Sequence, residues 1–233
     1  MSDLPRVDLT KHPHPALCEY PILSSDRSGW RGVFFNHYHH PAYESPEFQY
    51  TQHIIGITGN GHPIHSEHRF DGRVQTHYCQ PGEGLFIPAD ISYSSNWRQA
   101  GEFSLIGFFP KFFEQIINES VQIKQIELIP QIGLSDAFIR QIGIAFKADV
   151  EADHPAGRMF GESLATGLVI HLLTHYSAWQ IKPPPESVGG LPQYQLQKVK
   201  DYIRAHLNQN ISLSEIAGVL TLSGLKTRRF LIQ

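Results

Sequence analysis

Histidine and acidic side chains crowd one short stretch of this 233-residue chain. It reads His62-Pro-Ile-His65-Ser-Glu67-His68, which places three imidazoles and one carboxylate within seven residues. Such groups bind zinc, iron or manganese when three or four of them meet around the ion at about 2 Å. In an extended strand, however, His65 and His68 would point to opposite faces. We therefore interpret them as surface-loop histidines and expect no catalytic metal site.

Two further histidine groups invite the same question. The run His37-Tyr-His39-His40-Pro41 would either contact a small effector or form a polar loop, and we favour the loop. His171 and His175 lie one helical turn apart, where zinc could bridge them, but histidines satisfied within a core or interface are more common. Ser-His-Asp, Cys-His and phosphate-binding glycine patterns are all missing from the sequence, and Gly59-Asn-Gly61 is a turn. We expect neither enzymatic activity nor a cofactor.

Basic side chains gather towards the C-terminal end. Residues 192–233 carry a net charge of +4, whereas the whole chain carries −3. The basic residues of this segment are Lys198, Lys200, Arg204, Lys226, Arg228 and Arg229. A basic segment on an acidic body is typical of a protein that meets phosphates, although a solvated basic helix face has the same composition.

The elements that would carry these groups begin with β-structure over residues 30 to about 109. Short apolar runs cover residues 48–57, 74–78, 85–87, 91–93 and 103–109, and glycine, proline and aspartate turns separate them. This spacing predicts an antiparallel sandwich or a small barrel. Asp71-Gly72 predicts a hairpin with a type I′ turn.

A helical pattern follows Pro110. Ser135 can cap a helix, and its apolar positions are Phe138, Ile139, Ile142, Phe146 and Val150. A second helix is expected over residues 158–179, and its apolar stripe is Phe160, Leu164, Leu168, His171 or Leu172, and His175. Both stripes must be buried on the sheet or on a partner, so we expect a homodimer in which these helices form part of the interface.

A linker separates this part from the rest of the chain. Residues 181–192 contain three consecutive prolines and a Gly-Gly pair, which neither a helix nor a central strand can accommodate. We therefore expect domains at 1–180 and 193–233.

Beyond the linker the pattern indicates a helix-turn-helix. Leu196, Val199, Ile203 and Leu207 share one helical face. Ser212 and Glu215 form a capping box that opens a second helix. Leu222-Ser223 would end the turn and cap a third helix, the element that enters the major groove of DNA.

With these residues the chain resembles the AraC/XylS family of bacterial transcription regulators. The family's pattern is found in residues 196–207 and in Ile211-Ser-Leu-Ser-Glu-Ile-Ala217, and residues 52–57, 69–73 and 81–89 are similar to its regulatory domain. The resemblance implies an α+β protein: an N-terminal cupin-like antiparallel β-barrel with appended helices, then a short all-α, partial helix-turn-helix segment. It implies promoter DNA as the partner and allows a small-molecule effector in the barrel. The expected DNA-binding residues are Ser223, Lys226, Arg228, Arg229, Lys198 and Arg204.

The recognition helix departs from the family pattern. The family has an arginine six residues after the serine, and Arg229 stands at that position. Thr227 stands where the family has an apolar residue, and Phe230 comes one residue earlier than the family's phenylalanine. Thr221 stands where the turn usually has glycine. The family's second helix-turn-helix does not follow, so we expect a chain truncated within the first one. Fewer phosphate contacts predict weak or undetectable specific DNA binding.

Other properties bound the interpretation. Charged residues near the N-terminus interrupt any apolar run that could form a signal peptide. No apolar run reaches the ~20 residues that span a bilayer, and two cysteines, Cys18 and Cys79, are too few for a disulfide framework. We therefore expect a cytoplasmic protein with no membrane contact. Two alternatives remain open. One is a cupin-like ligand-binding or dimerisation module without DNA-binding activity, and the less favoured one is a cupin metalloenzyme.

Overall fold

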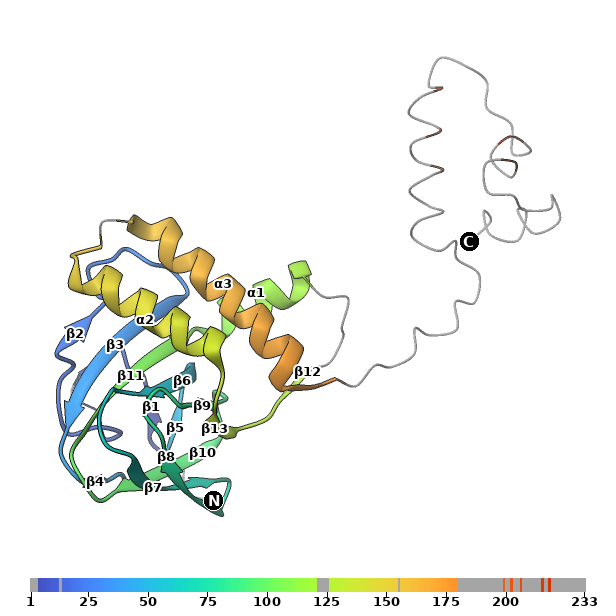
Figure 1. The fold of residues 1–233 in the computed structure, drawn as a ribbon. Helices are drawn as coiled ribbons and strands as arrows, with labels where there is room; N and C mark the ends of the chain where they lie inside the picture. Colours follow the sequence, from blue (N-terminus) through green and yellow to red (C-terminus); the bar gives the residue numbers. More distant parts are fainter. Residues whose placement is uncertain are drawn as a thin grey trace. The chain divides into compact units, whose positions relative to one another are not determined.

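A computed structural model describes residues 4–12, 14–120, 126–154 and 156–179, and in addition Val199, Tyr202, His206, Glu215 and Gly218. The chain divides into two compact units, Met1–Gln180 and Ile181–Gln233, and each is considered by itself. Most of the described residues belong to the first unit, a mixed α+β structure with two large sheets, a small two-stranded sheet and a few helices (Figure 1).

Two six-stranded sheets form most of the β-structure that is described in the first unit. The first sheet has the order β1-β5-β10-β7-β8, with β4 also paired to β10, and its strands are β1 (Arg6–Val7), β4 (Tyr43–Glu44), β5 (Phe48–Tyr50), β7 (Ile64–Phe70), β8 (Arg73–Cys79) and β10 (Ser92–Trp97). The second has the order β13-β9-β6-β11-β3-β2, and its strands are β2 (Leu23–Ser24), β3 (Val33–His40), β6 (His53–Thr58), β9 (Gly84–Ile87), β11 (Gly101–Phe108) and β13 (Gln131–Leu134).

The predicted closed barrel is wrong. Strand pairing ends at β1 and β8 in the first sheet and at β13 and β2 in the second, so among the described residues no ladder joins the two sheets. The strand pairs are antiparallel except for β1 with β5. Alternating side chains determine which face of a strand is buried, but they do not determine whether the end strands of a sheet pair with each other.

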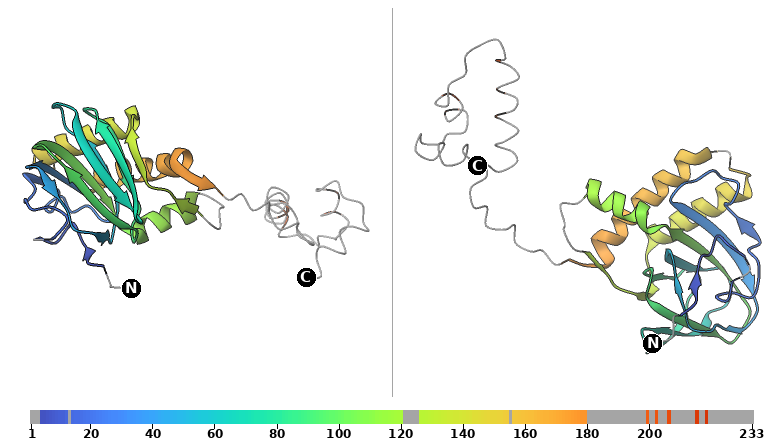
Figure 2. Two further views of the ribbon diagram at one scale, coloured as in Figure 1. Left: turned by 90° about the horizontal axis from the view of Figure 1, so that it is seen from below. Right: turned by 180° about the vertical axis from the view of Figure 1, so that it is seen from behind.

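Three helices complete the unit: α1 (Pro110–Ser120), α2 (Ala137–Glu151) and α3 (Gly157–Tyr176). Helices α2 and α3 lie on the face of the second sheet that is turned away from the first (Figures 1 and 2). Within the described residues, none of these helices is long and apolar enough to cross a bilayer. Helix α3 ends at Tyr176 rather than at Trp179, because residues 177–179 form β14 (Ser177–Trp179), which pairs with β12 (Ile126–Leu128).

The second sheet is buried on both faces, which creates two apolar cores. Phe35 and Ile106 face the helices together with Phe146 of α2. Phe34 and Tyr38 face the first sheet. This explains why β3 is buried almost along its whole length, although its sequence contains Asn36, three histidines and a tyrosine.

The Asp71-Gly72 turn confirms one local prediction. Both residues have positive φ angles, 46° and 78°, as a type I′ turn requires. They join β7 to β8, with Phe70 paired to Arg73 across the turn. The sequence here specifies the turn directly, because aspartate and glycine tolerate the left-handed conformation better than other residues.

The helical predictions were partly correct. In α2, four of the five expected apolar residues are buried, but Phe138 is 42% exposed. In α3 the buried face includes Leu168 and Leu172 as expected, but Gly161 and Ala165 replace Phe160 and Leu164, and His175 is exposed. Small residues are buried there because the indole of Trp30 lies against Gly161.

The cap of α2 is Asp136 and not Ser135. The Asp136 carboxylate accepts hydrogen bonds from the backbone N–H groups of Phe138 and Ile139, at 2.8 and 3.1 Å. The same carboxylate accepts hydrogen bonds from His171 and Tyr176 of α3, each at 2.7 Å. The two carboxylate oxygens of Asp136 accept hydrogen bonds from both helices, whereas a serine would offer a single hydroxyl oxygen.

Candidate ligand pocket

A pocket lies between the two sheets. The empty space within it is about 760 Å³, a volume that includes open solvent. Alternate residues of the facing strands point into it: Ile64, Ser66 and His68 of β7; Tyr93, Ser95 and Trp97 of β10; Phe103 and Leu105 of β11. The period of two in each strand produces this common lining.

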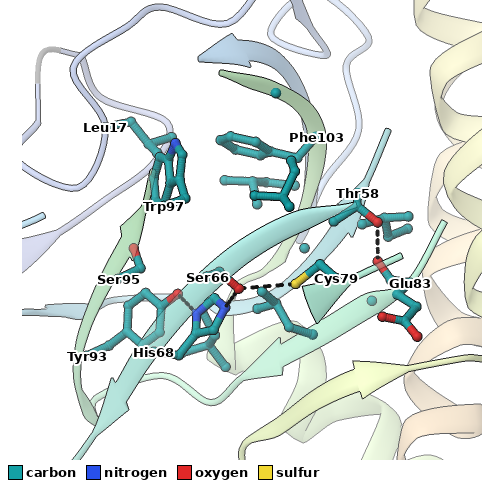
Figure 3. A pocket seen from close by; sticks show the side chains of 18 of the residues that line it. Leu17, Thr58, Ser66, His68, Cys79, Glu83, Tyr93, Ser95, Trp97 and Phe103 are labelled. Atoms are coloured by element: carbon teal, nitrogen blue, oxygen red, sulfur yellow. Dashed lines mark hydrogen bonds between the residues drawn. The ribbon is translucent and has the colours of Figure 1, made fainter. Parts of the chain in front are cut away.

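The pocket wall is mainly apolar, and several of its polar side chains form one connected group. Figure 3 shows Leu17, Trp97 and Phe103 on one side and Tyr93, His68, Ser66 and Cys79 on the other. The Tyr93 hydroxyl lies 2.8 Å from Nδ1 of His68, and Nε2 of His68 lies 2.9 Å from the Ser66 hydroxyl. We call these three residues the Tyr93–His68–Ser66 chain.

The Tyr93–His68–Ser66 chain is electrically neutral at neutral pH. Burial, with a smaller contribution from repulsion by His77, lowers the pKa of His68 to about 4. Burial raises the pKa of Tyr93 well above its usual value. Burial likewise raises the pKa of Cys79, whose sulfur lies 3.2 Å from the Ser66 hydroxyl. All four groups therefore offer hydrogen bonds without carrying charge.

One carboxylate also belongs to the pocket lining. Burial opposes ionisation of Glu83, but hydrogen bonds from the Gln80 backbone N–H and from His77 outweigh it and lower the pKa. The carboxylate accepts these bonds at 2.8 and 2.9 Å. Its charge is therefore satisfied at the rim of the first sheet by neighbours outside the pocket lining.

The buried His68 predicts a loss of stability in mild acid. Its folded pKa lies below the unfolded value of 6.5, so the unfolded chain takes up the proton first as pH falls. The free energy of unfolding should therefore decrease between about pH 6.5 and about pH 4. His68→Gln should make this decrease shallower in urea titrations followed by circular dichroism. The matched control is His65→Gln, which removes an imidazole from the opposite face of β7, and equal slopes for both variants would contradict the assignment.

The interpretation of residues 62–68 as surface-loop histidines is wrong for His68. Strand β7 contains His65, Glu67 and His68, and His68 is only 4% exposed. His65 and His68 do lie on opposite faces, as strand geometry predicts. Across the part of the chain that the structure describes, no group of three or more His, Cys, Asp or Glu side chains could hold a metal ion.

The cluster at residues 37–40 was also predicted to be a loop and instead belongs to β3. His37 is buried on the helix side, 2.9 Å from the Ser104 hydroxyl and 3.2 Å from the Lys147 ammonium nitrogen. His40 accepts a hydrogen bond from the Cys18 backbone N–H on the other side of the sheet. None of the histidines of this cluster lines the pocket between the sheets, so that pocket does not support the alternative of an effector contact.

His171 is satisfied within the protein, as favoured from its sequence. Besides its bond to Asp136, its ring centroid lies 4.6 Å from Phe138 and 4.5 Å from His175. These contacts tie the first turn of α2 to the last turns of α3. His171 is thereby a structural residue of the helix pair.

The six predicted DNA-binding residues, Ser223, Lys226, Arg228, Arg229, Lys198 and Arg204, lie outside the described residues. In the second unit Val199 and Tyr202 are helical and Val199 is buried. Nδ1 of His206 lies 2.8 Å from the Tyr202 carbonyl oxygen. Glu215 and Gly218 are also helical.

No model of a known protein family matches the chain, and no curated protein sequence matches it. Solved structures of several proteins are similar to it. The AraC-like transcriptional activator CuxR is 12% identical over 84% of this chain and 70% of its own, with a TM-score of 0.40. ToxT from Vibrio cholerae is 9% identical over 86% and 75% of the two chains, with a TM-score of 0.44.

A cupin protein from Bacteroides fragilis is similar over a shorter region. It is 16% identical over 42% of this chain and 83% of its own, with a TM-score of 0.32. At these TM-scores the likenesses carry no weight for the function of this chain. The assignment therefore depends on the residues themselves.

Proposed function

We propose that this protein is a DNA-binding transcription regulator of the AraC type and not an enzyme. Its first unit would bind a small effector between the two sheets, and its second unit would bind promoter DNA. Ser223, Lys226, Arg228 and Arg229 would contact the DNA at the third helix of the helix-turn-helix. Lys198 and Arg204 would contact phosphates.

The helix-turn-helix pattern of the second unit is the observation that carries this proposal. Its first helix is expected to bury the face of Leu196, Val199, Ile203 and Leu207, and the structure has Val199 helical and buried. Its second helix is expected to open with the Ser212–Glu215 capping box, and Glu215 is helical. The basic charge of the segment supports contact with phosphates.

The outer surface of the helix layer supports a homodimer. Phe138 and Ile144 of α2 are 42% and 54% exposed, and Ile170 of α3 is 39% exposed. A second copy of the chain packed on these helices would remove these side chains from water. We propose that a second copy of the chain covers them.

A second candidate is a ligand-binding or dimerisation module that does not read DNA. The pocket between the sheets favours it, because such a pocket needs no DNA-binding segment to work. The two candidates differ in one property, which is sequence-specific contact between the second unit and DNA.

Selection from a random duplex library distinguishes them. Specific binding is expected to be weak, so the selection is run at low salt, where phosphate contacts are strongest. We expect the purified chain to enrich a shared sequence only slowly, over several rounds. A variant with Lys226, Arg228 and Arg229 changed to alanine should enrich nothing. The matched control changes Lys11, Arg31 and Arg73 of the first unit to alanine, which removes the same charge. This control should enrich the same sequence as the unmodified chain. Failure of the unmodified chain to enrich any sequence would favour the module without DNA binding.

A further inference from the structure

The chemistry of the pocket defines the class of molecule that fits it. This step depends on the proposed function, because the molecule would be the effector of the regulator. Aromatic and aliphatic side chains form most of the wall, among them Trp97, Phe103, Leu85 and Leu105. Contact with such a wall favours an apolar body, which gains about 25 cal/mol for each Å² removed from water.

Charge complementarity argues against an ionic ligand. Among the described residues that line the pocket there is no lysine or arginine, and the one formal charge is the Glu83 carboxylate. A ligand carboxylate would be buried without a cation and near a like charge, which is costly in an apolar site. A ligand ammonium would compete with the hydrogen bonds that Glu83 already accepts from His77 and Gln80.

The Tyr93–His68–Ser66 chain offers either a donor or an acceptor. A neutral imidazole donates from one nitrogen and accepts at the other. In one tautomer Nδ1 of His68 accepts from the Tyr93 hydroxyl, and the phenol oxygen remains an acceptor. In the other tautomer Nδ1 donates to that oxygen, and the Tyr93 O–H is free to donate. A hydroxyl group could use either arrangement, and a carbonyl group could use the second.

We propose that the pocket binds an uncharged, mainly apolar molecule with one hydroxyl or carbonyl group, and that this group hydrogen-bonds to Tyr93 of the Tyr93–His68–Ser66 chain. Tyr93 and His68 are each 4% exposed, so the polar contact is made in a setting almost free of water. A hydrogen bond in such a setting selects for the matching group, because an unmatched buried polar atom loses its hydration without compensation. The apolar wall supplies affinity, and Tyr93 supplies selectivity.

Four ten-carbon probes of equal length test this assignment: 1-decanol, 2-decanone, decanoate and decylammonium. Each is titrated calorimetrically into the whole chain at pH 7.5, below its solubility limit and, for the two ions, below the micelle concentration. We expect the alcohol and the ketone to bind at least about tenfold more tightly than either ion, since an unpaired buried charge costs more than the 1.4 kcal/mol that a tenfold change represents.

Two tyrosine variants locate the polar contact. Tyr93→Phe keeps the ring and removes the hydroxyl, and it should weaken decanol binding about three- to tenfold. Tyr78→Phe removes the same group from a residue of β8 that is 64% exposed and outside the pocket lining, and it should leave all four affinities unchanged. Circular dichroism melting curves would verify that both variants are folded.

Three results would overturn the assignment. Decanoate or decylammonium could bind as tightly as decanol, which excludes an uncharged ligand. Decanol could bind equally to Tyr93→Phe and to the unmodified chain, which excludes the polar contact. The third result is that none of the four probes binds, which would exclude an apolar site of this kind. The DNA selection experiment uses none of these probes, so the proposed regulator and the proposed ligand class fail independently.

Discussion

Replacing Phe146 with alanine should lower the free energy of unfolding of the first unit by about 3–5 kcal/mol, the usual cost of removing a buried aromatic ring. Phe146 is fully buried at the centre of the helix–sheet core. Its ring centroid lies 5.0 Å from that of Trp30 and 6.1 Å from that of Phe35. The neighbours come from a loop and a strand, so they cannot collapse easily into the space that the ring leaves.

Phe138→Ala in the same helix is the matched control. The Phe138 side chain is 42% exposed, and its removal should cost about 1 kcal/mol or less. Urea denaturation followed by far-ultraviolet circular dichroism measures both values. Equal losses for the two variants would contradict the placement of α2 on the second sheet.

Replacing Asp136 with alanine should lower the free energy of unfolding by about 2–4 kcal/mol. The change removes a helix cap, which contributes about 0.5–2 kcal/mol, and hydrogen bonds to a charged acceptor, which contribute about 1.5–3 kcal/mol. It breaks the contacts to the α2 backbone and those to His171 and Tyr176 together. Ser135→Ala is the control and should change stability by less than about 0.5 kcal/mol, as surface substitutions usually do.

The effect of Asp136 should also depend on pH. Burial would raise its pKa, but the hydrogen bonds from His171, Tyr176 and the Ile139 backbone outweigh burial and lower the pKa to about 2. The folded value lies below the unfolded value of 3.8, so the carboxylate stabilises the fold above about pH 4 and loses this effect as pH falls towards 2. The difference between the unmodified chain and Asp136→Ala should shrink over that interval. A constant difference would show that the charge of Asp136 is unimportant.

Local sequence signals predicted the elements whose structure they specify directly. Asp71-Gly72 supplies two residues that tolerate positive φ, and the hairpin follows from them. Ile139, Ile142, Phe146 and Val150 repeat with the helical period, and α2 buries all four. In such cases the residues carry their own structural preference, so little information from distant parts of the chain is needed.

Tertiary relationships were harder to predict. Nothing in a strand's alternation shows that the sheets stay open, because pairing at the edges depends on the whole arrangement of strands. His68 looks like a surface residue by type, and it is buried only because Tyr93 and Ser66 provide its hydrogen bonds. The alternation of Ile64, Ser66, His68 and Phe70 was the available signal. Because Ser66 and His68 are polar, this alternation did not look like the apolar face of a buried strand.

For the second unit, the proposed DNA binding depends mostly on the sequence. Its capping box and apolar face predict a helix-turn-helix, and the described positions Val199, Tyr202 and Glu215 are helical as that prediction requires. The roles of Lys226, Arg228 and Arg229 stay predictions. Their charge makes those roles measurable through the dependence of DNA binding on salt.

That dependence gives the most direct test of DNA binding. Affinity for the selected duplex is measured by fluorescence anisotropy over a series of salt concentrations, for the unmodified chain and for the variant lacking Lys226, Arg228 and Arg229. Each phosphate contact removed should reduce the slope of log affinity against log salt by about one, so the triple variant should have a shallower slope, by about one for each of the three side chains that contacts a phosphate. The control lacking Lys11, Arg31 and Arg73 should keep the original slope. Equal slopes for all three proteins would contradict DNA recognition by the second unit.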